Sequence, residues 1–226
     1  MRLFFLALAL FALAGTAQAQ QPSQTAPPSS GSMLQGASVA APPIPADVLA
    51  SDAYKALIAD LRQGGYVIYL RHGMTGKASE ATVGDFADCS WQRNLSDAGR
   101  RQVASVGRRL SELNIPVAAL EASPYCRTRQ TAELAFGRVP KVNQDLFYHA
   151  TQTPEQVAAT NAKLKARLGE RPPAGGNLVL IGHSPAMKDA AAVELSEGEG
   201  VIVKPNGDGT FRIVAQLTEA GIMPVP

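Results

Sequence analysis

Concentrated charge of one sign is missing from this 226-residue sequence. Only 18% of the residues are charged, and 21 basic residues stand against 19 acidic ones, for a net charge of +2. The densest basic stretch, residues 96–110, spaces its arginines as on the solvent-facing side of a single helix. Because a nucleic-acid groove needs a broad basic patch, we expect no nucleic-acid partner.

Long hydrophobic runs are also missing. The main apolar run, residues 3–14, is too short to span a bilayer comfortably. It follows a positively charged start and precedes the small-residue pattern AQA at residues 17–19, which is typical of a cleaved secretory signal. An uncleaved anchor is the alternative, and the polar residues that follow disfavour it. We predict that residues 1–19 are a signal peptide. The mature protein would then be exported without stable membrane insertion, periplasmic in a Gram-negative source and otherwise secreted.

Residues 20–45 lack any hydrophobic period and are rich in proline, serine, glutamine and alanine. Such a composition buries too little surface to offset the entropy lost on ordering, so we predict a disordered linker. Across the whole chain 46% of the residues are hydrophobic, which leaves residues 46–226 enough apolar side chains for one globular domain. The sequence contains no internal repeat.

Helix and strand patterns alternate through this domain. Helices are expected over residues 46–63, from Ser96 onward, and over 127–136, 153–168 and 185–195. Strands are expected over residues 66–70, 117–122, 139–146, 177–182, 200–204 and 210–217. The alternation predicts an α/β fold, a three-layer α/β/α sandwich whose mainly parallel sheet ends in an antiparallel hairpin.

Cationic side chains follow three of the predicted strands. Arg71 and His72 follow the first strand, Arg127 follows the second, and His183 follows the strand over residues 177–182. The carboxyl ends of parallel strands share one edge, where ligands bind. Arginine offers a planar fork of donors for phosphate oxygens, and neutral imidazole is a nucleophile toward phosphorus. The sequence therefore predicts a phosphate site at this edge.

Four motifs around these residues resemble those of the histidine phosphatase superfamily, also called the phosphoglycerate mutase-like family. They are RHG at residues 71–73, RNLSDAGRRQ at 93–102, SPYCRTRQTAE at 123–133 and IGHSP at 181–185. RHG alone is a modest signal, whereas four motifs in the family's order form a strong one. The likeness extends over roughly residues 66–195 and implies a phosphoglycerate mutase-like fold.

The resemblance implies a hydrolase, a phosphomonoesterase of the histidine acid phosphatase type. His72 would attack the phosphorus of a small or surface-linked phosphate ester, and water would hydrolyse the resulting phosphohistidine. His72 must be neutral for this attack, whereas His183 is more useful as a cation. No metal or other cofactor is implied, and the oligomeric state stays open. The other residues implied to hold the substrate are Arg71, Gly73, Thr75, Arg127, His183 and Ser184.

The family's usual proton donor has no counterpart in this sequence. Many members carry a glutamate after the third strand, but residues 142–150 contain none, and Ser184 stands where others place an aspartate. Asp145, His149 and Glu194 are the candidate donors. Our hypothesis is that the donor is weak or supplied by the substrate, since a good leaving group needs little protonation. Two alternatives remain open, a non-catalytic phosphate-binding module and a phosphohistidine (phosphoramidate) phosphatase.

Cysteine is scarce, with Cys89 and Cys126 as the two present. The predicted export would place them in an oxidising compartment. The resemblance puts Cys126 inside the second-arginine motif and Cys89 in the segment that family members fold over the end of the first strand. We predict a disulfide between them beside the phosphate site, with two free thiols as the alternative. Arg129, two residues beyond Arg127, is expected at the surface or in a salt bridge.

Overall fold

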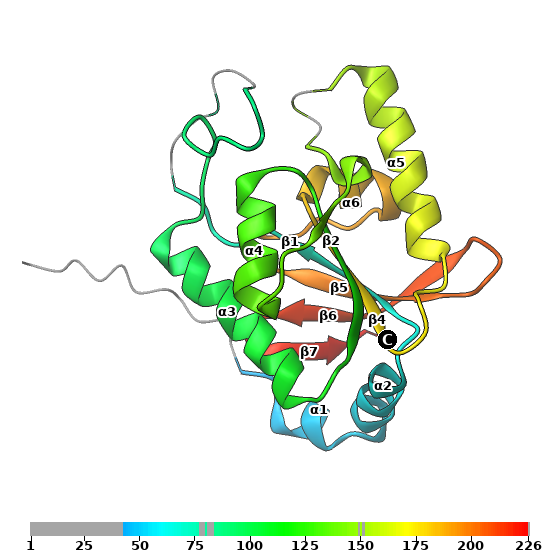
Figure 1. Ribbon diagram of the computed structural model, residues 1–226. Helices are drawn as coiled ribbons and strands as arrows, with labels where there is room; N and C mark the ends of the chain where they lie inside the picture. The colour runs from blue at the N-terminus through cyan, green and yellow to red at the C-terminus, as the bar shows by residue number, and fades with distance from the viewer. Residues whose placement is uncertain (1–42, 77–79, 81–83, 149, 151, 226) are drawn as a thin grey trace, which may run out of the picture. The chain divides into compact units, whose positions relative to one another are not determined.

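The computed structural model describes residues 43–76, 80, 84–148, 150 and 152–225. The predicted signal peptide, most of the predicted linker and the candidate donor His149 lie outside the described residues. Within the described part, seven strands form one sheet in the order β3-β2-β4-β1-β5-β6-β7 (Figure 1). The strands are β1 Val67–Arg71, β2 Val117–Ala122, β3 Lys141–Val142, β4 Asn177–Gly182, β5 Gly200–Pro205, β6 Phe211–Thr218 and β7 Gly221–Pro224.

The sheet has a parallel half and an antiparallel half that meet at β1. Strands β3, β2, β4 and β1 pair in parallel, and β1 then pairs with β5 in the antiparallel sense, as do β5 with β6 and β6 with β7. The predicted α/β fold with a mainly parallel core is therefore confirmed. The strand predicted over residues 139–146 is much shorter, because β3 gives way to the 3-10 helix η1 at Gln144–Leu146. Strand β7 escaped prediction because its four residues are too few to show an alternating pattern.

Three of the six helices in the described part of the chain begin at a polar residue whose side chain caps them. The six are α1 Ala46–Ala50, α2 Asp52–Gln63, α3 Asp97–Glu112, α4 Cys126–Phe136, α5 Pro154–Gly169 and α6 Ser184–Ala191. Ser96 caps α3 as predicted, and Thr153 forms a capping box with Gln156 on α5. Ser51 caps α2 and divides the predicted helix over residues 46–63 in two. Helix α6 ends earlier than predicted, at a left-handed Ala192 (φ 55°).

Helices cover both faces of the sheet, and the side chains of β1 show how. Ile68 and Leu70 pack into the core formed with α2, α3 and α4, whereas Val67 and Tyr69 pack into the core formed with α5 and α6. All four side chains are fully buried. The predicted three layers are thus present, and β1 lies at their centre (Figure 1). In the described part of the chain, no helix has the length and apolar character needed to cross a membrane.

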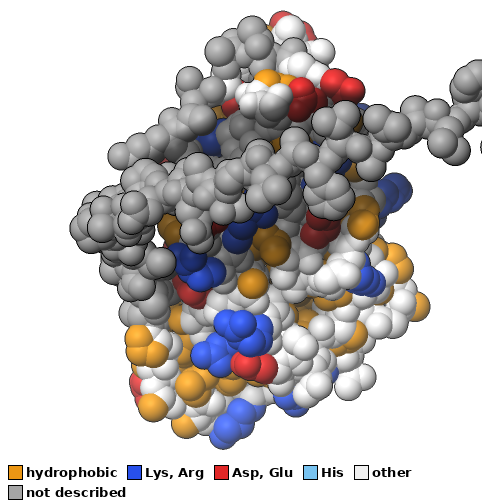
Figure 2. All heavy atoms as spheres, turned by 60° about the vertical axis from the view of Figure 1, so that its left-hand side comes forward, with side chains coloured by type: hydrophobic (Ala, Val, Ile, Leu, Met, Phe, Trp, Pro, Cys, Tyr) orange, Lys and Arg blue, Asp and Glu red, His pale blue; other side chains and the backbone are white. Residues whose placement is uncertain are grey.

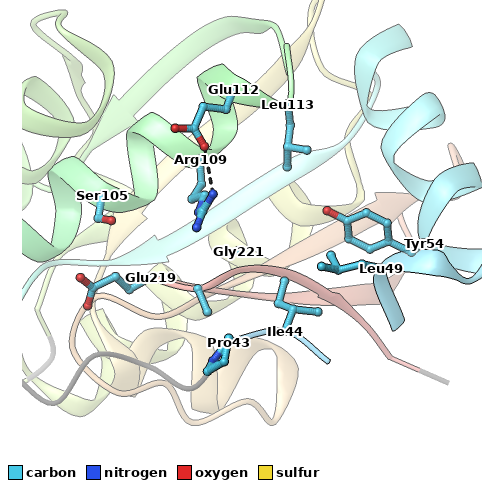
Figure 3. A pocket seen from close by; sticks show the side chains of 11 residues that line it. Pro43, Ile44, Leu49, Tyr54, Ser105, Arg109, Glu112, Leu113, Glu219 and Gly221 are labelled. Atoms are coloured by element: carbon cyan, nitrogen blue, oxygen red, sulfur yellow. Dashed lines mark hydrogen bonds and ion pairs between the residues drawn. The ribbon is translucent and has the colours of Figure 1, made fainter. Parts of the chain in front are cut away.

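Basic side chains are dispersed over the described part of one face of the molecule (Figure 2). On the face that Figure 2 shows, lysine and arginine side chains lie in small separate groups, some of them beside acidic side chains. A second surface feature is a cavity of about 400 Å³ between α1, α3 and β7 (Figure 3). Apolar Ile44 and Leu49 line it beside the ion pair of Arg109 with Glu112, whose nitrogen and oxygen are 3.0 Å apart.

Candidate active site

The carboxyl ends of β1, β2 and β4 bring the predicted site residues together. Strand pairing places Arg71 opposite Gly182 and Ala122 opposite Ile181, so the residues that follow these strands are neighbours. The rings of His72 and His183 have their centroids 5.4 Å apart, and both side chains are almost fully buried. The predicted convergence of the two histidines is therefore present.

His72 is held in one tautomer. Its Nδ1 lies 2.9 Å from the carbonyl oxygen of Gly73, which can only accept, so Nδ1 carries the hydrogen and Nε2 carries the lone pair. Its backbone N–H donates to the carbonyl of Gly182 at 3.2 Å. Burial, and then the charge of Arg127, hold the pKa of His72 well below its usual value of 6.5. His72 thus presents a neutral nitrogen.

Tyr69 in β1 fixes the backbone of His183. The Tyr69 hydroxyl accepts from the His183 N–H at 2.9 Å and donates to the His183 carbonyl at 3.0 Å. Burial raises the pKa of the Tyr69 hydroxyl, which keeps it a donor. Gly182 leaves room for this contact, since a Cβ there would lie 2.1 Å from the hydroxyl oxygen.

The surroundings of His183 disfavour the cationic form that the resemblance implies. Burial is the main cause that holds the pKa of His183 well below its usual value of 6.5, and the nearby His72 and Arg127 lower that pKa further. Its Nε2 lies 3.0 Å from the hydroxyl of Ser123. Its buried Nδ1 finds no hydrogen-bond partner among the described residues.

Arg127 is completely buried at the start of α4. Its Nη1 forms an ion pair with Glu80, and its guanidinium carbon lies 4.3 Å from the ring centroid of Tyr125 and 5.3 Å from that of Tyr148. In the described structure Nε and Nη2, the two donors of its side-on edge, are buried without a hydrogen-bond partner. That edge matches two oxygens of a tetrahedral anion.

Two further arginines flank His72 and share one carboxylate. Arg71 donates to the carbonyl of Leu195 at 2.6 Å, and one Nη2 from each of Arg71 and Arg93 lies 3.7 Å from Glu197. The same carboxylate lies 4.0 Å from Nδ1 of His72. Arg93 belongs to a motif that the sequence offered, but its role was not predicted. Glu80 and Glu197 were missed because they lie in irregular segments that carry no periodic signal.

A cavity of about 470 Å³ opens at these groups. Ser184, a predicted substrate-binding residue, lines it and accepts a hydrogen bond from the Leu195 N–H at 2.9 Å. The full lining consists of Arg71, His72, Arg93, Tyr148, His183, Ser184, Pro185, Lys188, Asp189 and Glu194. Arg71 and Arg93 thus bring positive charge to the cavity, and Lys188, Asp189 and Glu194 add side chains of both signs.

The polar groups of the other two predicted substrate-binding residues are engaged within the protein. The Gly73 N–H donates to the Thr131 hydroxyl at 3.1 Å. The hydroxyl and N–H of Thr75 both donate to Glu197, at 2.7 and 3.1 Å. The hydrogen bonds of both residues therefore stabilise the loop after β1.

The predicted proton donors are dispersed. Asp145 is paired with Lys163 at 2.9 Å and lines a separate cavity beside α5. Glu194 lines the His72 cavity, but its side chain is 75% exposed and paired with Lys188 at 3.3 Å. A carboxyl so exposed is a poor candidate for proton transfer at a buried phosphoryl group.

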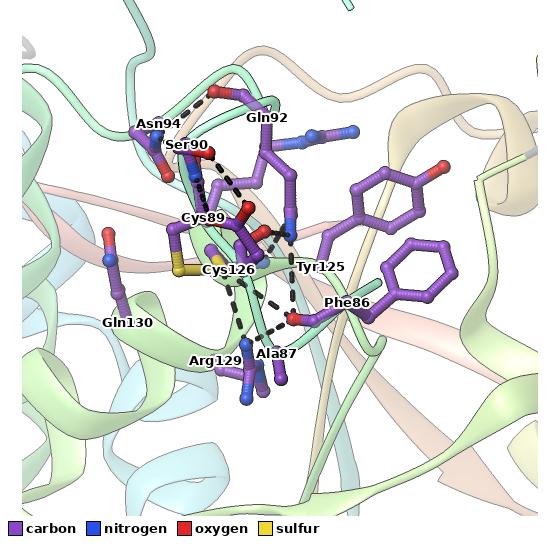
Figure 4. The surroundings of a disulfide bond; sticks show 12 residues. Phe86, Ala87, Cys89, Ser90, Gln92, Asn94, Tyr125, Cys126, Arg129 and Gln130 are labelled. Atoms are coloured by element: carbon purple, nitrogen blue, oxygen red, sulfur yellow. Dashed lines mark hydrogen bonds between the residues drawn. A yellow bond between two sulfur atoms is a disulfide. The ribbon is translucent and has the colours of Figure 1, made fainter. Parts of the chain in front are cut away.

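The predicted disulfide is confirmed, with the Cα atoms of Cys89 and Cys126 5.8 Å apart (Figure 4). It fastens residues 84–95, which we call the disulfide loop, to the start of α4. The side-chain oxygen of Gln92 accepts from the Cys126 N–H at 2.7 Å, and Arg129 donates to the Phe86 carbonyl at 2.7 Å. Arg129 therefore fastens this loop through a hydrogen bond to backbone, and it pairs with no carboxylate among the described residues.

Aromatic rings fill the space between the disulfide loop and the phosphate site. The ring centroid of Phe86 lies 4.9 Å from that of Tyr125 and 5.2 Å from that of Phe147, and Tyr125 lies 5.3 Å from the ring of His183. The loop thus shields Arg127 and His183 from solvent.

Among the described residues, no group of three or more histidine, cysteine, aspartate or glutamate side chains is arranged to hold a metal ion.

Comparison with known proteins agrees with this geometry. The family model described as "Histidine phosphatase superfamily (branch 1)" matches residues 67–146. No curated protein matches the sequence. Solved structures match in fold, among them the protein histidine phosphatase SixA complexed with tungstate, with a TM-score of 0.52, 18% identity, and coverage of 68% of this chain and 97% of that one. The open reading frame Rv3214 from Mycobacterium tuberculosis matches with a TM-score of 0.51, 17% identity, and coverage of 69% and 98%. Residues 67–146 therefore match the histidine phosphatase superfamily (branch 1), and the two solved structures share the fold of this chain.

Proposed function

We propose that the protein is a phosphatase that hydrolyses phosphomonoesters through a phosphohistidine on His72. The observation that carries this proposal is a set of buried nitrogen atoms around a neutral imidazole. They lack a hydrogen-bond partner within the described structure, and they are Arg71 Nε, Arg93 Nε, Arg127 Nε and Nη2, and His183 Nδ1. A buried donor without an acceptor costs about 1–3 kcal/mol, so this clustering suits a ligand that brings several oxygens.

The chemistry follows from the tautomer of His72. The Gly73 carbonyl holds the Nδ1 hydrogen, which leaves the Nε2 electron pair free to form a bond to phosphorus as the ester bond breaks. Donors from Arg127 and His183 would stabilise the charge on the phosphoryl oxygens in the transition state. Water would then attack the phosphohistidine and return His72 to its neutral form.

The substrate itself would restore the cationic form of His183. Burial, and then the nearby His72 and Arg127, lower the pKa of His183, and a phosphate dianion beside it would act in the opposite direction. His183 would then donate to a phosphoryl oxygen as a charge-assisted hydrogen bond.

The substrates we propose are small or surface-linked phosphate esters with a polar leaving group. Lys188, Asp189 and Glu194 line the cavity together with the histidines and provide charges of both signs. Such a lining favours hydroxylated or zwitterionic groups over purely apolar ones.

We also propose that the protein works outside the cytoplasm. The leading segment with its AQA pattern and the disulfide between Cys89 and Cys126 support export, because disulfides persist in oxidising compartments. Cell fractionation and sequencing of the mature N-terminus test this proposal. A product that still begins at Met1 and stays in the cytoplasm would contradict it.

Hydrolysis of para-nitrophenyl phosphate in the presence of a chelator tests the proposed activity. The wild type should turn over and form an acid-labile phosphohistidine, and His72→Ala should do neither. Tight binding of inorganic phosphate without turnover would instead support a phosphate-binding module. Activity confined to phosphoramidates would support a phosphohistidine phosphatase.

A further inference from the structure

We infer that Glu80 is the acid–base carboxyl of the reaction, an inference that rests on the proposed function. A poor leaving group such as an alkoxide needs a proton as its bond to phosphorus breaks, and a positioned acid typically contributes about 10² to 10⁴-fold. In the described structure Asp145 is paired with Lys163, and the side chain of Glu194 is largely exposed to solvent. Neither of these two carboxyls therefore holds a shielded proton beside His72.

Glu197 lies on the wrong side of His72 for this task. Its carboxylate accepts from Thr75 and faces Nδ1 of His72, the nitrogen that carries hydrogen and points away from phosphorus. Glu80, in contrast, is paired with Arg127, the buried guanidinium that we propose holds the phosphoryl group. Its side chain is 14% exposed, so a proton on it would be shielded from bulk solvent.

Glu80 and the phosphoryl group would share one guanidinium. Nη1 of Arg127 is paired with Oε1 of Glu80, whereas Nε and Nη2, which form the side-on edge, are buried and unpaired in the described structure. A phosphoryl group on that edge would lie next to the carboxylate in the same plane of donors. The Arg93 N–H also donates to Oε1 of Glu80 at 3.0 Å. Both bonds use Oε1, and we assign proton transfer to Oε2.

The proton balance closes over two steps. The substrate brings the proton when it binds as a phosphate monoanion, and Oε2 of Glu80 relays it. In the first step the Nε2–P bond forms, the ester P–O bond breaks, and the leaving oxygen takes the proton from Glu80. In the second step a water oxygen bonds to phosphorus, the P–Nε2 bond breaks with its electron pair returning to His72, and Glu80 accepts the water proton.

Leaving-group dependence tests this assignment. Glu80→Gln removes the proton but keeps the shape, and Asp145→Asn serves as a matched control on a carboxyl outside the site. We expect Glu80→Gln to lower kcat/KM for glycerol phosphate by about 10² to 10³-fold. The burst rate of nitrophenolate release from para-nitrophenyl phosphate should fall less than about tenfold, because that leaving group needs little protonation. Glu80→Asp should recover part of the loss, and Asp145→Asn should leave both rates unchanged.

Three results would overturn the assignment. Equal losses on both substrates would contradict proton donation. A gain in activity or in affinity for inorganic phosphate in Glu80→Gln would show that the Glu80 carboxylate competes with phosphate for Arg127. A loss of phosphate affinity with an unchanged kcat would make Glu80 a positioning residue only. Each of these leaves the proposed function standing if the wild type forms phosphohistidine, whereas a wild type that forms none overturns both. Thermal unfolding of each variant excludes misfolding as the cause.

Discussion

The proposed phosphate site is built from two kinds of backbone, strand ends and loops, which are held in different ways. His72 and His183 follow β1 and β4 at the centre of the sheet, and backbone pairing and the Tyr69 hydroxyl fix them. The disulfide loop is partly exposed and is fastened by one covalent bond and a few side-chain contacts. On the proposed function, the sheet positions the nucleophile, and the loops hold the carboxylates that pair with the arginines.

Loss of the proposed nucleophile on the strand side should lower kcat/KM more than any other change considered. On the proposed function, His72→Ala removes the atom that bonds to phosphorus, so kcat/KM should fall by at least about 10⁴-fold. Steady-state assays with para-nitrophenyl phosphate measure it. Thermal unfolding should show that the variant stays folded, and retained turnover would contradict the role of the strand end.

Arg127→Lys tests the paired guanidinium donors of Arg127 at the start of α4. Lysine keeps the charge but cannot present two parallel donors, so kcat/KM should fall by about 10² to 10³-fold. Arg129→Lys is the matched control, because Arg129 holds the Phe86 carbonyl and is not expected to touch the substrate. Equal losses in the two variants would show that loop fastening, and not phosphate binding, explains both.

Removal of the disulfide tests the loop side directly. The bond between Cys89 and Cys126 joins residues 37 apart in sequence, and the double variant to serine should lower the free energy of unfolding by about 3 to 4 kcal/mol. Urea unfolding measures this. We expect KM to rise more than kcat falls, because His72 stays in place. A large fall in kcat alone would mean that the loop also controls the nucleophile.

Tyr69→Phe makes the corresponding change on the sheet side. It removes a buried hydroxyl and leaves the N–H of His183 without its acceptor, which should cost about 1–3 kcal/mol of stability. Because the backbone of His183 is less firmly fixed, kcat should fall severalfold with KM nearly constant. Unfolding and steady-state kinetics measure the two effects, and a change confined to KM would contradict this view.

The pH dependence should show the smallest effect. Burial and Arg127 lower the pKa of His72, so the free enzyme keeps a neutral nucleophile below pH 6.5 and kcat/KM should stay level there. A half-maximal value at pH 6.5 would contradict this. Stability should behave differently. The unfolded chain binds more protons than the folded one between the lowered pKa values and 6.5, so stability should fall as pH drops through this range.

Strand ends could be predicted from sequence, and loops could not. Buried runs such as residues 177–182 lead into polar motifs, and parallel pairing brings such ends together, so Arg71, His72, Arg127 and His183 were predicted. The Cys89–Cys126 disulfide was predicted from the expected export and from the family resemblance, which places both cysteines beside the site.

Glu80, Arg93 and Glu197 depend on how irregular segments fold back, which no periodicity reports. Each lies outside the helices and strands, and each gains its place through a contact with an arginine, a backbone N–H or a hydroxyl distant in sequence. The same limit explains why Asp145 was wrongly predicted as a donor. Its position after the third strand suggested that role, but its side chain is paired with Lys163 on α5.

The sulfur–sulfur bond also changes what a cut in the chain would mean. It closes a covalent ring that contains α3 and β2, so a protease that cleaves one peptide bond between Cys89 and Cys126 leaves both pieces in one molecule. His72 and His183 both lie outside that ring. In a nicked form the imidazoles of His72 and His183 would therefore stay in one covalent molecule. The fragments would separate only after the disulfide is reduced.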